Sequence, residues 1–233
     1  MKPLTKRLQT ALDLLPACRL AADIGCDHGI AAEEIIFANR ATDILKYTKK
    51  VLACDISAPS LEKAKARLTR AGLAAHAEFF CCDGLAKANE ADGALLLGMG
   101  GRTIVEILQK GRSLLPQMRG LVAGPAGHAE ALYRALPALG LRVEDERIVW
   151  ENGRFFPLVL LVPGTQRPLL GAAEELGPVN CQRRDETTLR YAAWLCRVLE
   201  KTLRVPGASR TAAHQEEAAG RLACLHAFLE EER

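Results

Sequence analysis

Short apolar runs alternate with amphipathic segments from residue 19 to about residue 163 of the chain. The apolar runs predict β-strands at residues 19–24, 51–55, 77–82, 93–97, 120–123, 142–150 and 156–162. Between them, apolar positions with helical spacing predict helices at residues 31–39, 60–71, 103–112 and 128–139. Alternating strands and helices are typical of a parallel sheet covered by helices on both faces. Asn152-Gly153 between the last two runs favours a tight hairpin, which would give the sheet an antiparallel edge.

The pattern changes after Val162. Arg167-Pro168 and Gly177-Pro178 predict a linker-like stretch, and two helical segments follow at residues 186–203 and 209–231, with Ser209 as the expected N-cap of the second. Their apolar stripes are Leu189, Cys196, Leu199 and Leu203 on the first and Leu222, Leu225 and Leu229 on the second. We therefore expect a main domain at residues 1–165 and, within residues 166–233, a helical hairpin that leans on it or projects as a coiled-coil arm.

Composition places the chain among soluble globular proteins. Hydrophobic residues make up 49% and charged residues 25% of the sequence, and a net charge of +3 is too small to identify a nucleic-acid binder. Aromatic residues are only 5%, which argues against an aromatic-rich stacking surface. No stretch approaches the roughly 20 apolar residues of a membrane span, and the basic, polar N-terminus is typical of neither a signal peptide nor an anchor. We expect a cytoplasmic protein that does not bind membranes.

The eight cysteines have no C-x-x-C spacing and form no compact cluster. Several lie inside apolar runs, where a free cysteine behaves as a small buried hydrophobic residue. This distribution predicts reduced thiols and no metal site.

An aspartate ends each of three consecutive predicted strands: Asp23, Asp55 and Asp83. The carboxyl ends of parallel strands line the ligand crevice of open α/β sheets, so these side chains predict a binding site. The first turn reads Asp23-x-Gly25-x-x-x-Gly29; it lacks the G-x-G-x-x-G of a dinucleotide site and matches the methyltransferase pattern E/D-x-G-x-G-x-G except at Asp27. The charge of Asp27 disfavours pyrophosphate and suits the sulfonium and amino groups of S-adenosylmethionine. A glycine turn that only joins strand to helix is the alternative.

The other strand ends have their own expected roles. Asp55 can accept hydrogen bonds from both hydroxyls of a ribose; it could instead cap the next helix, a role that Ser57 or Ser60 fits better. Asp83 stands where an acid commonly binds the adenine amino group. The fourth strand ends in Gly98-Met99-Gly100-Gly101, which predicts a flexible loop over the reacting centre with Met99 as an apolar contact. A tight crossover, at which the helix packs on the strand, is the alternative for this loop.

Four segments together resemble the bacterial tRNA (adenine-22-N1)-methyltransferase family: Leu4-Thr5-Lys6-Arg7-Leu8-Gln9-Thr10, Ala22-Asp23-Ile24-Gly25-Cys26-Asp27-His28, Asp83-Gly84-Leu85 and Gly98-Met99-Gly100-Gly101. The resemblance covers the whole chain. It implies an α/β fold with the Rossmann-like seven-stranded sheet of class I methyltransferases and a C-terminal coiled-coil arm that helps to engage tRNA. It also implies S-adenosyl-L-methionine as cofactor, S-adenosyl-L-homocysteine as product and tRNA methylation at N1 of adenine. The residues expected to bind the cofactor are Asp23, Gly25, Cys26, Gly29, Asp55, Ile56, Asp83, Gly84, Leu85, Gly98, Gly100 and Gly101.

The chain departs from the family pattern mainly on the substrate side. The fifth strand ends in Ala123-Gly124-Pro125-Ala126 where the family usually has Leu-Gln-Pro-Asn, so an amide pair that could contact the target base is missing. Phe156 or its neighbour stands in place of a family tyrosine, and Asp55 in place of a glutamate.

Adenine N1 carries a lone pair and needs no deprotonation, so positioning should supply much of the catalysis. We hypothesise that Asp27 stabilises the positive charge that develops on the base, that His28 orients Asp27 or the base unless it is structural, and that Met99 contacts the reacting centre. The candidates for RNA contact are Lys6, Arg7, Arg102, Arg183, Arg184, Arg190 and Arg197. Two alternatives are a methyltransferase for a small molecule, another RNA or a protein, and a silent cofactor-binding module that holds RNA or a partner. The apolar stripes are compatible with a monomer or a homodimer.

Overall fold

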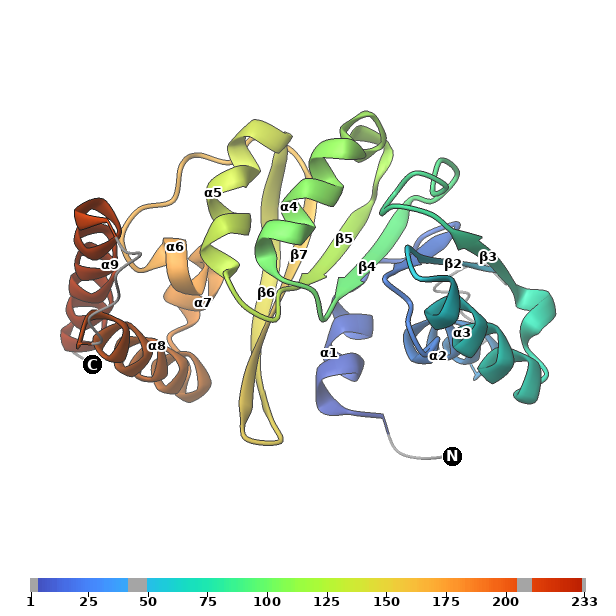
Figure 1. Cartoon of the computed structure of the whole chain (residues 1–233), viewed down its shortest axis with the longest axis horizontal. Helices are drawn as coiled ribbons and strands as arrows, with labels where there is room; N and C mark the ends of the chain where they lie inside the picture. Colours follow the sequence, from blue (N-terminus) through green and yellow to red (C-terminus); the bar gives the residue numbers. More distant parts are fainter. Residues whose placement is uncertain (1–3, 42–49, 205–210, 232–233) are drawn as a thin grey trace.

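The computed structural model describes the backbone of residues 4–41, 50–204 and 211–231, and the side chains of these residues except 38–41. Its strands are β1 (Ala21–Ile24), β2 (Val51–Asp55), β3 (Ala77–Cys81), β4 (Gly93–Leu97), β5 (Gly120–Gly124), β6 (Leu141–Glu151) and β7 (Arg154–Pro163). They form a seven-stranded sheet in the order β3-β2-β1-β4-β5-β7-β6 (Figure 1). Strand β7 runs antiparallel to both of its neighbours, and the other pairs are parallel. The predicted strands and the Rossmann-like sheet with an antiparallel edge are confirmed.

Helices cover both faces of the sheet. The helices before β6 are α1 (Lys6–Leu14), α2 (Ile30–Ala41), α3 (Ala58–Arg70), α4 (Gly101–Lys110) and α5 (Ala129–Leu139), with short 3-10 turns η1 (Ala74–His76) and η2 (Arg112–Gln117). Ala22 of β1 lies in one apolar core with Ile104 of α4 and Leu132 of α5. Its neighbour Ala21 lies in a second core with Leu12 of α1. Because successive strand residues point to opposite faces, the Ala- and Leu-rich strands can be buried on both sides.

Residues 166–185 fold differently from the expected linker. They contain two short helices, α6 (Ala173–Leu176) and α7 (Pro178–Arg183). Pro178 stands in the first turn of α7, where a missing backbone N–H costs no hydrogen bond. Leu176 and Asn180 are both buried. Residues 165–170 form no helix or strand, as a linker would, but the prediction is wrong for residues 173–183, because helices of four and six residues are too short to show a helical apolar period.

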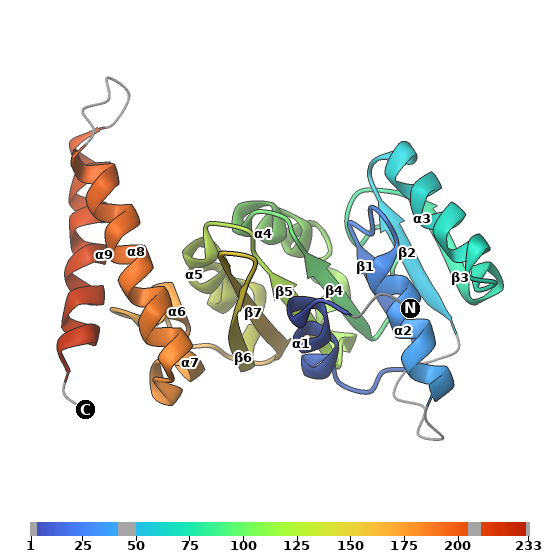
Figure 2. The ribbon, with the colours of Figure 1, turned by 90° about the horizontal axis from the view of Figure 1, so that it is seen from below.

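The last two helices, α8 (Glu186–Arg204) and α9 (Ala212–Glu230), stand side by side at one end of the molecule (Figures 1 and 2), and α8 contacts β6. This confirms the predicted hairpin, and we call it the arm. Cys196, Leu199 and Leu225 of the predicted stripes are buried in a core that also includes Ile148 of β6. The N-cap of α9 is Thr211, whose side chain accepts a hydrogen bond from the backbone N–H of His214; the predicted cap, Ser209, lies outside the described residues.

None of the helices that the structure describes is both long and apolar enough to cross a membrane. All eight cysteines are free thiols.

Candidate active site

The turn after β1 lies where the strand order reverses, between β1 and β4, which is the position at which open α/β sheets bind ligands. The backbone N–H groups of Gly25 and Cys26 both donate to the carbonyl oxygen of Cys54 in β2, at 2.8 and 3.1 Å. A positive φ of 75° at Gly25 allows the chain to reverse there. These bonds bring the predicted residues of the first two strands together.

Asp23 is buried behind this turn. Its Oδ2 accepts a hydrogen bond of 3.1 Å from the backbone N–H of Ala32, in the first turn of α2. Burial, reinforced by the neighbouring charge of Asp55, raises the pKa of Asp23 to about 7. Among the described residues, no donor is assigned to the other oxygen, Oδ1. This carboxyl group therefore has capacity for a ligand that donates hydrogen bonds or carries positive charge.

Asp55 holds the same turn from the end of β2. Its Oδ2 accepts from the backbone N–H of Asp27 at 3.0 Å, and its Oδ1 accepts from the backbone N–H of Ser57 at 2.8 Å. The first bond supports Asp27 in a left-handed conformation, with φ of 34°, which few side-chain-bearing residues adopt. Since each carboxylate oxygen can accept two hydrogen bonds, the predicted ribose contact stays compatible with both. Ser57 caps α3 by accepting from the N–H of Ser60, as the sequence favours.

The end of β3 lies beside an exposed apolar side chain. The backbone N–H of Cys82 donates to the carbonyl of Asp55 at 3.0 Å, which keeps the two strand ends adjacent. Ile56 follows Asp55 and is 74% exposed, so it can cover one face of a flat ligand ring. The Oδ2 of Asp83 is 2.5 Å from Nζ of Lys110, an ion pair that competes with the predicted adenine contact.

Three predicted cofactor-binding residues also serve packing. The side chain of Leu85 lies in the core of the sheet, so only its backbone could reach a ligand. A Cβ on Gly84 would come within 2.8 Å of Ile107 in α4, and one on Gly29 within 2.9 Å of Ala64 in α3. These glycines allow the two helices to approach the candidate site closely.

The glycine-rich loop after β4 is held against the loop after β5. Backbone N–H groups of Gly98, Ala126 and Gly101 donate to the carbonyls of Gly124, Met99 and Gly127, at 3.0, 2.9 and 2.8 Å respectively. A Cβ on Gly101 would overlap the carbonyl oxygen of His128, so this end of the loop is a tight crossover. Gly100 is the N-cap of α4. The methyl group of Met99, by contrast, lies 2.8 Å from where a Cβ on Gly25 would stand, so Met99 faces the turn after β1.

Asp27 and His28 are neighbours on the open side of the turn, and both side chains are more than half exposed. The Nε2 of His28 lies 3.4 Å from one oxygen of Asp27, and Nζ of Lys63 in α3 lies 3.9 Å from the other. The pair can therefore contact a molecule approaching from solvent. This geometry is compatible with the predicted role of His28 in orienting Asp27.

A family model described as a methyltransferase domain matches residues 4–159 of the chain. The chain belongs to this methyltransferase family. Over 167 residues, or 69% of its length, it is 31% identical to the tRNA (adenine(22)-N(1))-methyltransferase of Bacillus subtilis, and the match covers 66% of that protein.

Two solved structures share the fold of this methyltransferase over its whole length. The B. subtilis tRNA methyltransferase TrmK superposes with a TM-score of 0.84 at 24% identity, covering 99% of this chain and 100% of that chain. M. capricolum TrmK in complex with S-adenosyl-homocysteine superposes with a TM-score of 0.80 at 19% identity, covering 99% of each chain. The similarity thus includes the arm as well as the sheet.

Several arginines that the sequence offers for RNA contact have partners within the methyltransferase. Arg7 lies over the ring of Phe156, 4.7 Å from its centroid, and its Nε is buried. Arg184 lies over the ring of Phe228 and pairs with Glu231. Both side chains are thus engaged in contacts within the protein. Lys6, Arg102, Arg190 and Arg197 remain exposed.

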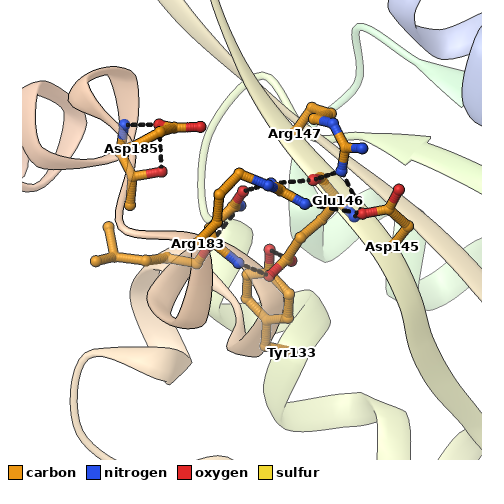
Figure 3. Close-up of polar contacts among 9 residues, drawn as sticks. Tyr133, Asp145, Glu146, Arg147, Arg183 and Asp185 are labelled. Carbon is orange, nitrogen blue, oxygen red and sulfur yellow. Dashed lines mark hydrogen bonds and ion pairs between the residues drawn. The ribbon is translucent and has the colours of Figure 1, made fainter.

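Arg183, another RNA-contact candidate, belongs to a buried junction between β6, α5 and α7 of the methyltransferase (Figure 3). Its guanidinium donates to the carbonyl of Glu146 at 2.8 Å and to the carboxylate of Asp145 at 3.0 Å. The carboxyl group of Glu146 accepts from the hydroxyl of Tyr133 at 2.7 Å and from the backbone N–H of Asn180 at 2.8 Å. Burial raises the pKa of Glu146 to about 7. The junction fastens α7, which precedes the arm, to β6 and α5, and no local motif in the sequence indicates it.

A cluster of four aromatic side chains, which we call the aromatic wall, is a further feature that the sequence did not predict. It consists of Trp150, Phe155, Tyr191 and Trp194, with ring centroids of successive pairs 4.4 to 6.0 Å apart. The expectation that low aromatic content excludes a stacking surface is therefore wrong. Strands β6 and β7 and helix α8 bring both tryptophans of the chain together. The aromatic content of the whole sequence does not reveal such a local cluster. The placement of Tyr191 and Trp194 three residues apart on a helix was the available signal.

Proposed function

We propose that this methyltransferase transfers the methyl group of S-adenosyl-L-methionine to N1 of an adenine in tRNA, at position 22 as in its Bacillus relative, and releases S-adenosyl-L-homocysteine. The observation that carries the proposal is the 31% identity to that enzyme across 167 residues. Within this proposal, residues 1–165 form the catalytic domain, residues 166–233 form the region that contains the arm, and the protein acts in the cytoplasm.

The residues at the carboxyl edge fit this cofactor. When bound, it supplies a methyl group activated by a positively charged sulfur. The free oxygen of buried Asp23 suits the cationic part of such a ligand, Asp55 the ribose hydroxyls and Asp83 the adenine amino group. Ile56 offers its exposed apolar surface to the adenine ring.

The target nitrogen sets what the protein must do. N1 lies on the Watson–Crick edge, so any base pair there must open before the base enters the site. Because its lone pair attacks without losing a proton, the protein needs no general base at this atom. The product ring is cationic, and the exposed carboxylate of Asp27 would stabilise that charge as it develops, with His28 fixing its orientation.

The substrate side differs from the family pattern at Gly124. Gly124 stands where the family usually has glutamine. A Cβ at this position would lie 2.8 Å from Leu97 and 3.0 Å from Leu158, so these leucines pack against the backbone where a side chain would begin. This observation favours a second candidate function, methylation of another base or RNA by the same cofactor cleft.

The decisive experiment is methyl transfer from labelled S-adenosyl-L-methionine to unmodified bacterial tRNA, followed by nucleoside digestion and mass spectrometry. We expect 1-methyladenosine. Asp27→Asn should slow transfer by about 100- to 1000-fold while cofactor binding persists. Glu62→Gln, which removes an exposed carboxylate from nearby α3, is the matched control and should leave the rate unchanged. A different methylated nucleoside would support the second candidate, and full turnover of folded Asp27→Asn would exclude the role of Asp27.

A further inference from the structure

A groove of about 870 Å³ separates the loop after β5 from the arm. On the side of the sheet it is lined by Pro125, Ala126 and His128. On the opposite side it is lined by Phe155 of β7 and by Tyr191, Trp194 and Val198 of α8. The backbone N–H of Ala126 donates to the carbonyl of Met99, so the groove begins beside the loop that faces the candidate reacting centre.

The far wall of this groove is aromatic: Tyr191 is buried within it, and Trp194 is open to solvent. The rings of Tyr191 and Trp194 are stacked at 14°, with centroids 5.8 Å apart, and Phe155 lies against both. Trp194 and Val198 are each 40% exposed, and Trp150 is 38% exposed. Large aromatic side chains left exposed beside a groove are typical of surfaces that bind a ligand.

The charges of the groove admit a polyanion. Each of its acidic side chains has a cationic partner inside the protein: Glu130 and Glu175 pair with Arg221, and Glu217 pairs with Arg134. Arg102, at the end near Met99, has no ion pair among the described residues. Outside the groove lining, Arg190 lies over the ring of Trp150, 5.2 Å from its centroid, and pairs only loosely with Glu186, at 3.8 Å. Arg102 can thus neutralise a phosphate in the groove, and Arg190 can neutralise one beside the exposed ring of Trp150.

We infer that the aromatic wall stacks an unpaired nucleobase of the RNA substrate, next to the adenine that is methylated. This inference rests on the proposed function and names the part of the RNA that the arm recognises. A duplex does not expose the faces of its bases, whereas methylation at N1 requires an opened pair, so an unstacked base is present close to the reacting centre. Any base can stack on an aromatic ring, so the wall contributes affinity for an unpaired strand and little sequence specificity.

The test uses the intrinsic fluorescence of the protein, because both tryptophans of the chain belong to this wall. Titration of the full-length protein with unmodified tRNA should quench the emission, and titration with a fully paired RNA duplex of equal length should not. Trp194→Ala should weaken tRNA binding by roughly 5- to 150-fold. Trp194→Phe should recover most of that loss, since a phenyl ring still stacks. Leu170→Ala, at an exposed apolar position that does not line the groove, is the control and should change affinity less than twofold.

The outcomes separate this inference from the proposed function. If the wild-type protein methylates tRNA but Trp194→Ala binds it with unchanged affinity and no quenching occurs, the stacking inference is wrong. It is also wrong if the emission changes with protein concentration in the absence of RNA, together with a doubling of the mass in solution, because the wall then joins two copies of the chain. If the wild-type protein transfers no methyl group to tRNA, the proposed function itself is contradicted.

Discussion

Two buried carboxyl groups distinguish the ligand-binding edge of the sheet from the region that leads into the arm. Asp23 lies under the turn after β1, and Glu146 lies where β6 meets α7, the helix that precedes the arm; burial raises the pKa of each to about 7. They differ in their hydrogen bonds. Asp23 accepts one, from Ala32, whereas Glu146 accepts from Tyr133 and Asn180 and faces Gly177 so closely that any Cβ there would overlap it. The carboxyl group of Glu146 is thus held by two donors of the protein, whereas that of Asp23 keeps acceptor capacity for a ligand.

This difference suggests a rule that distinguishes polar residues that bind a ligand from polar residues that stabilise the fold. At the sheet edge, turns and backbone hydrogen bonds hold polar groups that have remaining capacity. At the arm, the polar groups of segments far apart in the sequence are paired with one another through ion pairs and hydrogen bonds. Variants at the edge should therefore alter ligand binding with small changes in stability, and variants at the arm should do the reverse.

The largest stability effect is expected for Arg221→Ala at the arm. The Nε and Nη2 atoms of Arg221 donate to both carboxylate oxygens of buried Glu175, at 2.5 and 2.8 Å. Removing the guanidinium leaves that charge without its partner, which should lower the free energy of unfolding by about 3–5 kcal/mol. Chemical denaturation measures this, and calorimetry should find cofactor affinity unchanged. Arg204→Ala, which breaks the exposed pair with Glu200, is the control and should cost less than about 0.5 kcal/mol. A similar loss in both variants would contradict the rule.

The pH dependence of stability should contain a contribution from each buried carboxyl group. In the folded protein Glu146 titrates near pH 7 instead of 4.5, so the folded state holds the extra proton between these values. The stabilising contribution is complete below pH 4.5 and is lost as the pH rises to about 7, by about 3 kcal/mol. Asp23 acts in the same direction, from 3.8 to about 7.

Chemical denaturation between pH 4 and 7 should show that the free energy of unfolding falls less steeply with pH in Glu146→Gln and in Asp23→Asn than in the wild-type protein. Saturating S-adenosyl-L-methionine should reduce the contribution of Asp23, because a cationic ligand favours the ionised carboxylate, and leave that of Glu146 intact. If the ligand reduced the Glu146 contribution equally, the two sites would not be independent.

Gly25→Ala should separate backbone strain from ligand binding. A side chain at φ of 75° costs about 1–2 kcal/mol, and the new Cβ would also displace the methyl group of Met99. Gly72→Ala is the control, since Gly72 has φ of 69° and no other group lies within 4 Å of where its Cβ would stand. Both variants should lose similar stability in thermal denaturation, and only Gly25→Ala should lose cofactor affinity in calorimetry. Equal affinity in the two variants would place the ligand away from this turn.

The sequence predicted what local pattern encodes. Apolar runs located the strands, and the acids that end them located the carboxyl edge, because topology then brings strand ends together without further information. The arm junction depends instead on pairs far apart in the chain, such as Arg221 with Glu175 and Arg134 with Glu217, separated by 46 and 83 residues. No local signal reveals which arginine such a carboxylate will engage. For this reason Arg183 and Arg184, which look available for RNA in the sequence, are engaged in internal contacts in the fold.

The smallest effect is expected where an internal ion pair and a ligand share one carboxylate. Nζ of Lys110 is 2.5 Å from Asp83, the predicted partner of the adenine amino group. Lys110→Ala should release Asp83 and tighten cofactor binding by no more than about fivefold, because exposed ion pairs contribute little. Lys50→Ala, which removes a similar exposed pair with Glu78 in β3, should leave affinity unchanged. If Lys110→Ala instead weakened cofactor binding, the lysine would be part of the ligand site. The ion pair of Asp83 and Lys110 would then be required as a unit, like the ion pairs at the arm.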